Sequence, residues 1–192
     1  ELRDPYLVGH TRRVQRYAAL VGQRLGLNDS ELATLDIASC LSQVGKIFVP
    51  EDILTKAGRL DEEQIQDMRR HVDHALRVIA PIEFDLPIAE TIAQMYERLD
   101  GSGYPKGLRG DQIQPLARIL GVVDVFCALT ETRAYRHEQS PGKSMIYLAQ
   151  HPQRYDVKVV AALAEVLAAD GASSEELTAE EPRAEPSTEV AA

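Results

Sequence analysis

The chain has 192 residues, of which 44% are apolar and 27% are charged, and this composition fits one soluble domain with a proper core. Its formal charge of −9 makes it a poor non-specific ligand of nucleic acid. We recognise no signal peptide and no apolar run near the ~18 residues of a membrane span, so we expect a cytoplasmic protein that binds neither nucleic acid nor membrane.

Apolar residues recur at intervals of three and four along the first 170 residues, and this periodicity predicts an all-helical fold. Gly26 is a stop signal for the first helix, and Asn28 or Ser30 is a cap for the second. The predicted helices are, in chain order, 14–25, 32–44, one that begins at Asp61 and carries His71, one entered at Pro87 that carries Met95 and Tyr96, 118–130, 140–150 and 157–169. We therefore expect a compact bundle of about seven helices.

Residues 171–192 differ from the rest of the chain because they contain six glutamates and one arginine, a formal charge of −5. They are otherwise rich in Ala, Ser, Thr and Pro and have little to bury, which is typical of a disordered extension. The sequence thus predicts a domain over 1–170 and an acidic disordered tail over 171–192, with a functional role for the tail left open.

Two cysteines, Cys40 and Cys127, lie in apolar helical stretches without CxxC spacing. We expect two buried free thiols rather than a disulfide.

The segment from Asp100 to Gly107 has the composition of a rigid turn. Its glycines allow positive φ, Pro105 fixes a corner, and we expect Tyr104 to present its ring outward. Such a loop can bind a ligand or a protein, and the alternative is a helix connection kept for packing.

Several motifs resemble the HD-GYP family. Residues 93–105 read AQMYERLDGSGYP and 41–50 read LSQVGKIFVP, and they are similar to the family's HHExxDGxGYP and LHDIGKIGIP stretches. Further matches follow in order over about 160 residues, at 3–14, 50–60, 107–110, 117–120, 124–130 and 133–136. The resemblance implies the helical fold of the HD superfamily and metal-dependent hydrolysis of the bacterial second messenger cyclic di-GMP.

Four ligand positions of the family carry different residues here. By the resemblance, Ser42 and Gln43 replace the His-Asp pair, while Met95 and Tyr96 replace the double histidine. A hydroxyl, an amide, a thioether and a protonated phenol are poor ligands for the two or more transition metals that this chemistry needs.

Three positions still match the family's ligand pattern: His10, His71 and Asp124. Two imidazoles and a carboxylate could hold one metal. The alternative, which we favour, is a set of polar residues hydrogen-bonded to one another and to Ser42, Gln43 or Tyr96. We expect no cofactor, and a divalent transition metal only if the first alternative holds.

The resemblance also implies contacts for nucleotide and protein. It nominates the following residues for binding cyclic di-GMP without metals: Tyr104, Arg133, Arg136, Lys46 and Lys56. Each cation has an alternative interpretation as a solvated surface charge. In the family the GYP loop is linked to docking with diguanylate cyclases (GGDEF domains), which here implicates Asp100, Gly101, Gly103, Tyr104 and Pro105.

We therefore predict a catalytically degenerate HD-GYP domain, without catalytic residues, that acts as a regulatory or protein-interaction module in bacterial cyclic di-GMP signalling. The alternatives are a cyclic di-GMP phosphodiesterase with a reduced metal site and a metal-free cyclic di-GMP receptor.

Overall fold

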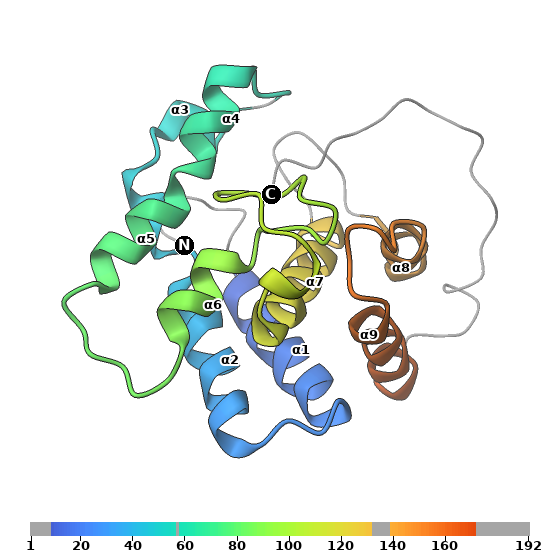
Figure 1. The fold of residues 1–192 in the computed structure, drawn as a ribbon. Coiled ribbons are helices and arrows are strands. Elements are labelled where there is room, and N and C mark those ends of the chain that lie inside the picture. Colours follow the sequence, from blue (N-terminus) through green and yellow to red (C-terminus); the bar gives the residue numbers. More distant parts are fainter. Residues whose placement is uncertain (1–8, 57, 132–138, 172–192) are drawn as a thin grey trace.

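A computed structural model of the chain describes residues 9–56, 58–131 and 139–171 (Figure 1). All regular structure in these ranges is helical, so the all-α prediction is confirmed. The elements are α1 (His10–Arg24), α2 (Asp29–Leu41), η2 (Val44–Phe48), α3 (Glu51–Leu54), α4 (Glu62–Arg69), α5 (His71–Ile79), α6 (Ile88–Gln94), η3 (Gly110–Gln112), α7 (Pro115–Leu129), α8 (Pro141–Ala149) and α9 (Val157–Ala169).

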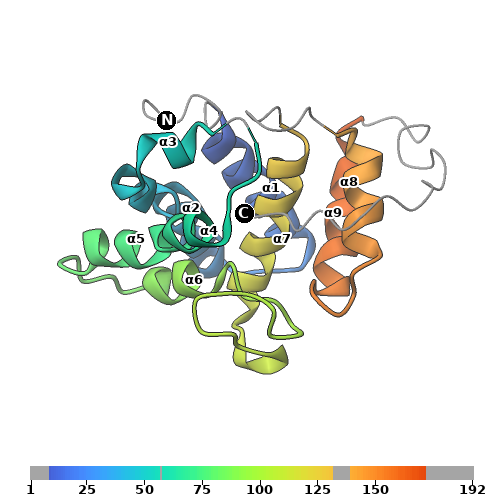
Figure 2. The ribbon, with the colours of Figure 1, turned by 90° about the horizontal axis from the view of Figure 1, so that it is seen from above.

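Helix α7 forms the centre of the bundle. Its sequence is apolar on every side, which is the pattern of a helix buried by neighbours all round. Helices α1, α2 and α6 contact it, and α8 and α9 pack side by side against it from another direction (Figures 1 and 2). Asp124 is therefore a carboxylate held inside an apolar core, where it needs hydrogen-bond partners.

The connection between α1 and α2 forms as predicted. Gly26 has φ 78°, and the Asn28 side chain accepts hydrogen bonds from the backbone N–H groups of Ser30 and Glu31. Glu31 returns a bond to the backbone of Asn28, which completes a capping box. These contacts fix the angle at which α2 meets α1.

Three of the differences from the predicted helices bear on the candidate site. The helix expected from Asp61 is divided at Arg70 into α4 and α5. The second helix ends at Leu41, and η2 follows it because its backbone packs directly against α5: a Cβ on Gly45 would lie 1.8 Å from the backbone oxygen of His71. Helix α6 stops at Gln94, so the next two residues lie just beyond its end.

The cysteine prediction is half wrong. Cys127 is a buried free thiol, but Cys40 is exposed because it lies on the outer face of α2. Residues 172–192, which contain nearly all of the predicted tail, lie outside the described ranges. None of the described helices is long and apolar enough to cross a membrane.

Candidate functional site

The candidate site is centred on His10, the first residue of α1, which is 2% exposed. Its Nε2 lies 3.1 Å from Oδ1 of Asp124, and its Nδ1 lies 2.8 Å from Oε2 of Glu131. Burial alone would lower the pKa of His10, but the hydrogen bonds to the two carboxylates outweigh it and raise the pKa. The protonated imidazole can donate to both carboxylates at once.

Glu131 also binds Arg13, one turn along α1. Nη1 of Arg13 donates to Oε1 of Glu131 at 3.0 Å, and Nη2 donates to Oγ1 of Thr130 at 2.7 Å. Glu131 was not among the residues predicted from the sequence, although its position just after the motif at 124–130 was an available signal. Glu131 brings a second carboxylate, besides that of Asp124, to His10.

Gln43 and Tyr96 extend the network. Nε2 of Gln43 donates to the Tyr96 hydroxyl at 3.0 Å and lies 3.3 Å from Oδ1 of Asp124. Burial, followed by the nearby charge of Asp124, raises the pKa of Tyr96, so the phenol stays protonated. The predicted hydrogen-bonded cluster is thus present for His10, Asp124, Gln43 and Tyr96.

His71 joins this cluster through a ring contact rather than a hydrogen bond. Its ring stands edge-on to Tyr96 with centroids 5.0 Å apart, and its Nδ1 donates to the backbone oxygen of Met68 at 2.7 Å. Burial, aided by the charge of Lys46, lowers the pKa of His71 to about 4, so the ring is neutral near pH 7. Within the described residues, its Nε2 is buried without a hydrogen-bond partner.

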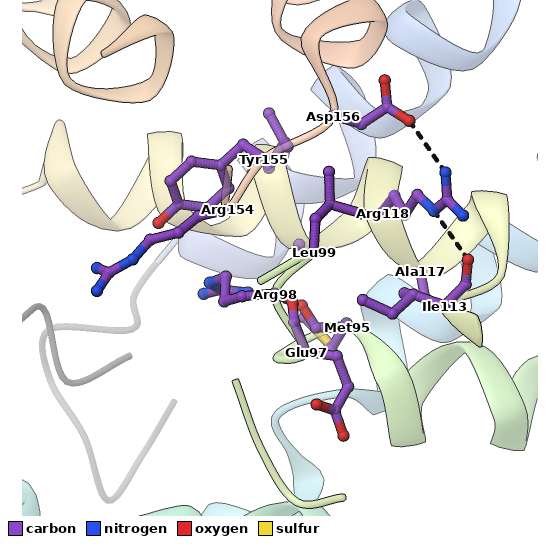
Figure 3. A pocket seen from close by; sticks show the side chains of 12 residues that line it. Met95, Glu97, Arg98, Leu99, Ile113, Ala117, Arg118, Arg154, Tyr155 and Asp156 are labelled. Carbon is purple, nitrogen blue, oxygen red and sulfur yellow. Dashed lines mark hydrogen bonds and ion pairs between the residues drawn. The ribbon is translucent and has the colours of Figure 1, made fainter. Parts of the chain in front are cut away.

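Two further ligand-like positions lie apart from this network. Ser42 is buried and donates back into α2, to the oxygen of Ser39 at 3.0 Å. Met95 is fully buried and lines a separate pocket beside α7 (Figure 3). That pocket has a free volume of about 10 Å³, which is room for one water molecule.

The residues do not fit the metal centre that the family implies. Both ring nitrogens of His10 bind carboxylates, and the Asp124 atom Oδ1 is shared with Gln43. A protonated phenol occupies the space beside His71, whose Nε2 remains the one imidazole atom suited to a transition metal in this cluster. Among the described residues, no group of three or more His, Cys, Asp or Glu is arranged to hold a metal ion.

The predicted outward orientation of Tyr104 is wrong. Its ring is stacked on Tyr96 with centroids 5.1 Å apart and an angle of 4° between planes, and the Arg69 guanidinium covers it at 4.9 Å. The ring packs inward, between the aromatic face of Tyr96 and the Arg69 guanidinium. Tyr104 therefore covers the candidate site.

The rest of the predicted loop is held by short-range bonds. Oδ1 of Asp100 accepts from the Ser102 backbone at 2.9 Å, and Gly101 has φ 81°. Gly103 packs so closely that a Cβ on it would lie 2.4 Å from the backbone nitrogen of Arg98. Pro105 is exposed, so the loop still presents surface to solvent.

Glu97, which the sequence analysis did not single out, fastens this loop. Its carboxylate is 5% exposed and accepts hydrogen bonds from the backbone N–H groups of Lys106, at 2.7 Å, and Leu108, at 2.9 Å. Its position next to Met95 and Tyr96 in the motif was the available signal. A buried acceptor of two backbone donors ties the loop to the end of α6.

The structure places only some of the residues that were nominated as nucleotide contacts at the candidate site. Lys46 is half-buried and its charge reaches His71, so it lies at the candidate site. Lys56 hydrogen-bonds to Gln64 of α4 instead. Arg133 and Arg136 lie outside the described residues.

The fold and this pairing of a histidine from α1 with an aspartate from the central helix define a helical His–Asp architecture. A family model described as "HD domain" matches residues 1–159. The chain therefore belongs to the HD domain family, and the predicted relationship to HD-GYP proteins is confirmed by the relatives below.

Two curated relatives are phosphodiesterases by name. The chain is 36% identical over 166 residues to "Cyclic di-GMP phosphodiesterase response regulator RpfG" of Xanthomonas campestris, covering 85% of this chain and 44% of that protein. It is 30% identical over 151 residues to "3'3'-cGAMP-specific phosphodiesterase 3" of Vibrio cholerae, covering 79% and 33%. The chain thus spans less than half the length of these relatives.

A solved structure shows the same fold. It is titled "Bd1817, a HDG"Y"P protein from Bdellovibrio bacteriovorus" and has a TM-score of 0.69 at 20% identity, covering 83% of this chain and 51% of that chain. The names of the relatives favour the phosphodiesterase alternative over the degenerate module. The side chains at the site favour the degenerate module over the phosphodiesterase.

Proposed function

We propose that this chain is an HD-GYP-type domain that has lost metal-dependent hydrolysis and acts as a regulatory, protein-binding module. The observation that carries the proposal is the hydrogen-bonded chain of Tyr96, Gln43 and Asp124, at 3.0 and 3.3 Å. By the resemblance all three positions supply metal ligands, and here the Gln43 amide bonds both the Tyr96 hydroxyl and the Asp124 carboxylate. The Gln43 amide donates within this chain while its Oε1 is buried without a hydrogen-bond partner among the described residues, so these side chains give no support to hydroxide generation by metals.

We further propose that a protein partner docks on the loop of residues 97–109. Glu97 holds the loop in one conformation, so a partner would bind a surface that is already ordered. Cyclic di-GMP signalling is the context in which we place this module, because the relatives named above act on cyclic dinucleotides. A diguanylate cyclase is the partner that the resemblance nominates.

A phosphodiesterase is the second candidate, and the named relatives favour it. The buried Nε2 of His71, which has no hydrogen-bond partner in the part of the chain that the structure describes, is the feature of the site that agrees with it. In that case His71 and Asp124 would hold a metal and Lys46 would face the phosphate. A metal-free receptor for cyclic di-GMP is the third candidate, with Lys46 and Tyr104 as contacts.

A turnover assay separates these candidates. The full chain, loaded in turn with Mn²⁺ and Fe²⁺, is incubated with cyclic di-GMP and with 3'3'-cGAMP. We expect no linear product. Turnover that disappears in His71→Ala would establish the phosphodiesterase, and calorimetric binding of cyclic di-GMP without turnover, lost in Lys46→Gln, would establish the receptor.

A further inference from the structure

A cationic face surrounds the loop of residues 97–109, on a chain whose formal charge is −9. The side chains that contact or belong to this loop include five cations, Arg69, Arg98, Lys106, Arg109 and Arg154, and two carboxylates, Glu97 and Asp100. Five against two leaves a formal +3, so the rest of the chain carries −12. We refer to these five cations as the cationic face.

Each of the five cations belongs to the loop or lies against it. Arg69 covers Tyr104, next to Pro105 and Lys106, and Arg109 packs on Gly101. The backbone oxygen of Arg154 accepts from Leu99 at 3.1 Å. Arg98 and Arg154 both border the pocket beside Tyr155 (Figure 3).

Most of this positive charge lacks a carboxylate. Arg154 lies 3.5 Å from Asp100, while the other four cations form no ion pair with any carboxylate of residues 9–56, 58–131 and 139–171. The carboxylate of Glu97 is buried and already accepts two backbone bonds. Nearby Asp111 and Asp156 pair with Arg118. Arg98 is half-buried and donates to backbone oxygens, so the capacity of the face for an anionic partner lies mainly with the exposed Lys106 and Arg109.

We propose that the acidic segment 172–192 of this same chain binds the cationic face. The segment has six glutamates and one arginine, so its formal charge of −5 is opposite in sign to the +3 of the face and exceeds it. It is tethered at the end of α9, and its extended reach of ~70 Å exceeds the ~40 Å width of a domain this size. Tethering gives an effective concentration near the millimolar range, so weak charge pairs suffice.

The contact itself does not depend on the proposed function. Its regulatory consequence rests on that function: a segment bound to the cationic face would compete with a docking partner for the same loop. Solvated charge pairs screened by salt would make the contact reversible.

A spin-label measurement on the full chain tests the contact without any partner. The exposed Cys40 is changed to Ser, and Ser187→Cys carries a nitroxide, while Cys127 is buried. We expect the amide signals of residues 98–109 to weaken about twofold or more at ~0.01 M salt and to recover at ~1 M, where the screening length falls from ~30 to ~3 Å. Amides around Asp36, on the outer face of α2, are the internal control.

Two charge variants complete the test. Lys106→Gln combined with Arg109→Gln should remove the broadening, and so should a chain with glutamine at all six tail glutamates, Glu175, Glu176, Glu180, Glu181, Glu185 and Glu189. Equal broadening at the control amides, no broadening at low salt, or broadening that survives either variant would overturn the proposal. None of these results bears on turnover, so this proposal can fail while the proposed function stands.

Discussion

Tyr96 is the residue on which the account of the site most depends. Its hydroxyl binds the Gln43 amide, its ring receives the edge of His71 on one side, and Tyr104 stacks on it. Tyr96 is thus the packing centre of the cluster. A phenol here cannot be exchanged for imidazole without rebuilding these contacts.

Removing the Tyr96 hydroxyl should lower the stability of the fold by the contribution of one hydrogen bond. We expect Tyr96→Phe to lower the free energy of unfolding by about 1 kcal/mol, because the Gln43 amide loses one acceptor. Urea unfolding of Tyr96→Phe, Gln43→Leu and the double variant measures the coupling between the two residues. If the stability loss of the double variant equals the sum of the losses of the two single variants, the hydrogen bond contributes nothing to the free energy of unfolding.

His71 should make the fold sensitive to acid. Its pKa of about 4 in the folded protein lies below the ordinary value of 6.5, so folding favours the neutral ring. The difference between the two pKa values corresponds to about 3 kcal/mol of folding stability. This stability is fully present above pH 6.5 and is lost as the pH falls toward 4.

The pH dependence can be isolated by comparing His71→Gln with the unmodified chain, both in EDTA. We expect the variant to lose less stability between pH 6.5 and 4, as measured by urea unfolding at each pH. Parallel stability curves would show that His71 titrates at its ordinary pKa.

At the scale of elements, the end of α6 and the following loop form one unit. Met95 and Tyr96 come directly after the helix, and the loop returns to them: the backbone nitrogen of Tyr104 donates to the oxygen of Tyr96 at 3.2 Å. Glu97 adds two bonds from its buried carboxylate. Changes at the candidate site therefore reach the proposed docking loop through adjacent residues.

Glu97→Ala should loosen this loop. Two backbone donors would lose a charged acceptor, and we expect a loss of about 2 kcal/mol or more in unfolding free energy. Hydrogen exchange at the amides of Lys106 and Leu108 should accelerate more than the global loss explains. The exposed Glu83→Ala is the matched control, and similar exchange in both variants would contradict the role of Glu97.

At the scale of the whole molecule, the helices were predictable because their apolar periodicity and caps are local signals. The pairing of His10 with Asp124 could be expected from the family pattern and from the need of a buried carboxylate for a partner. The orientation of Tyr104 could not, because it depends on Arg69 and Tyr96, which reach it from separate elements. Glu131 was missed because it lies one residue beyond the motif that drew attention.

Metal binding by the whole domain tests the central claim most directly. Purified chain is incubated with Mn²⁺, Fe²⁺ or Zn²⁺, desalted and analysed for metal per chain, beside a variant with four restored ligands: Ser42→His, Gln43→Asp, Met95→His and Tyr96→His. The account predicts no stoichiometric metal in the unmodified chain, none when only the first two changes are made, and metal retained by the fourfold variant. One or more tightly bound ions per unmodified chain, lost in His71→Ala, would contradict it.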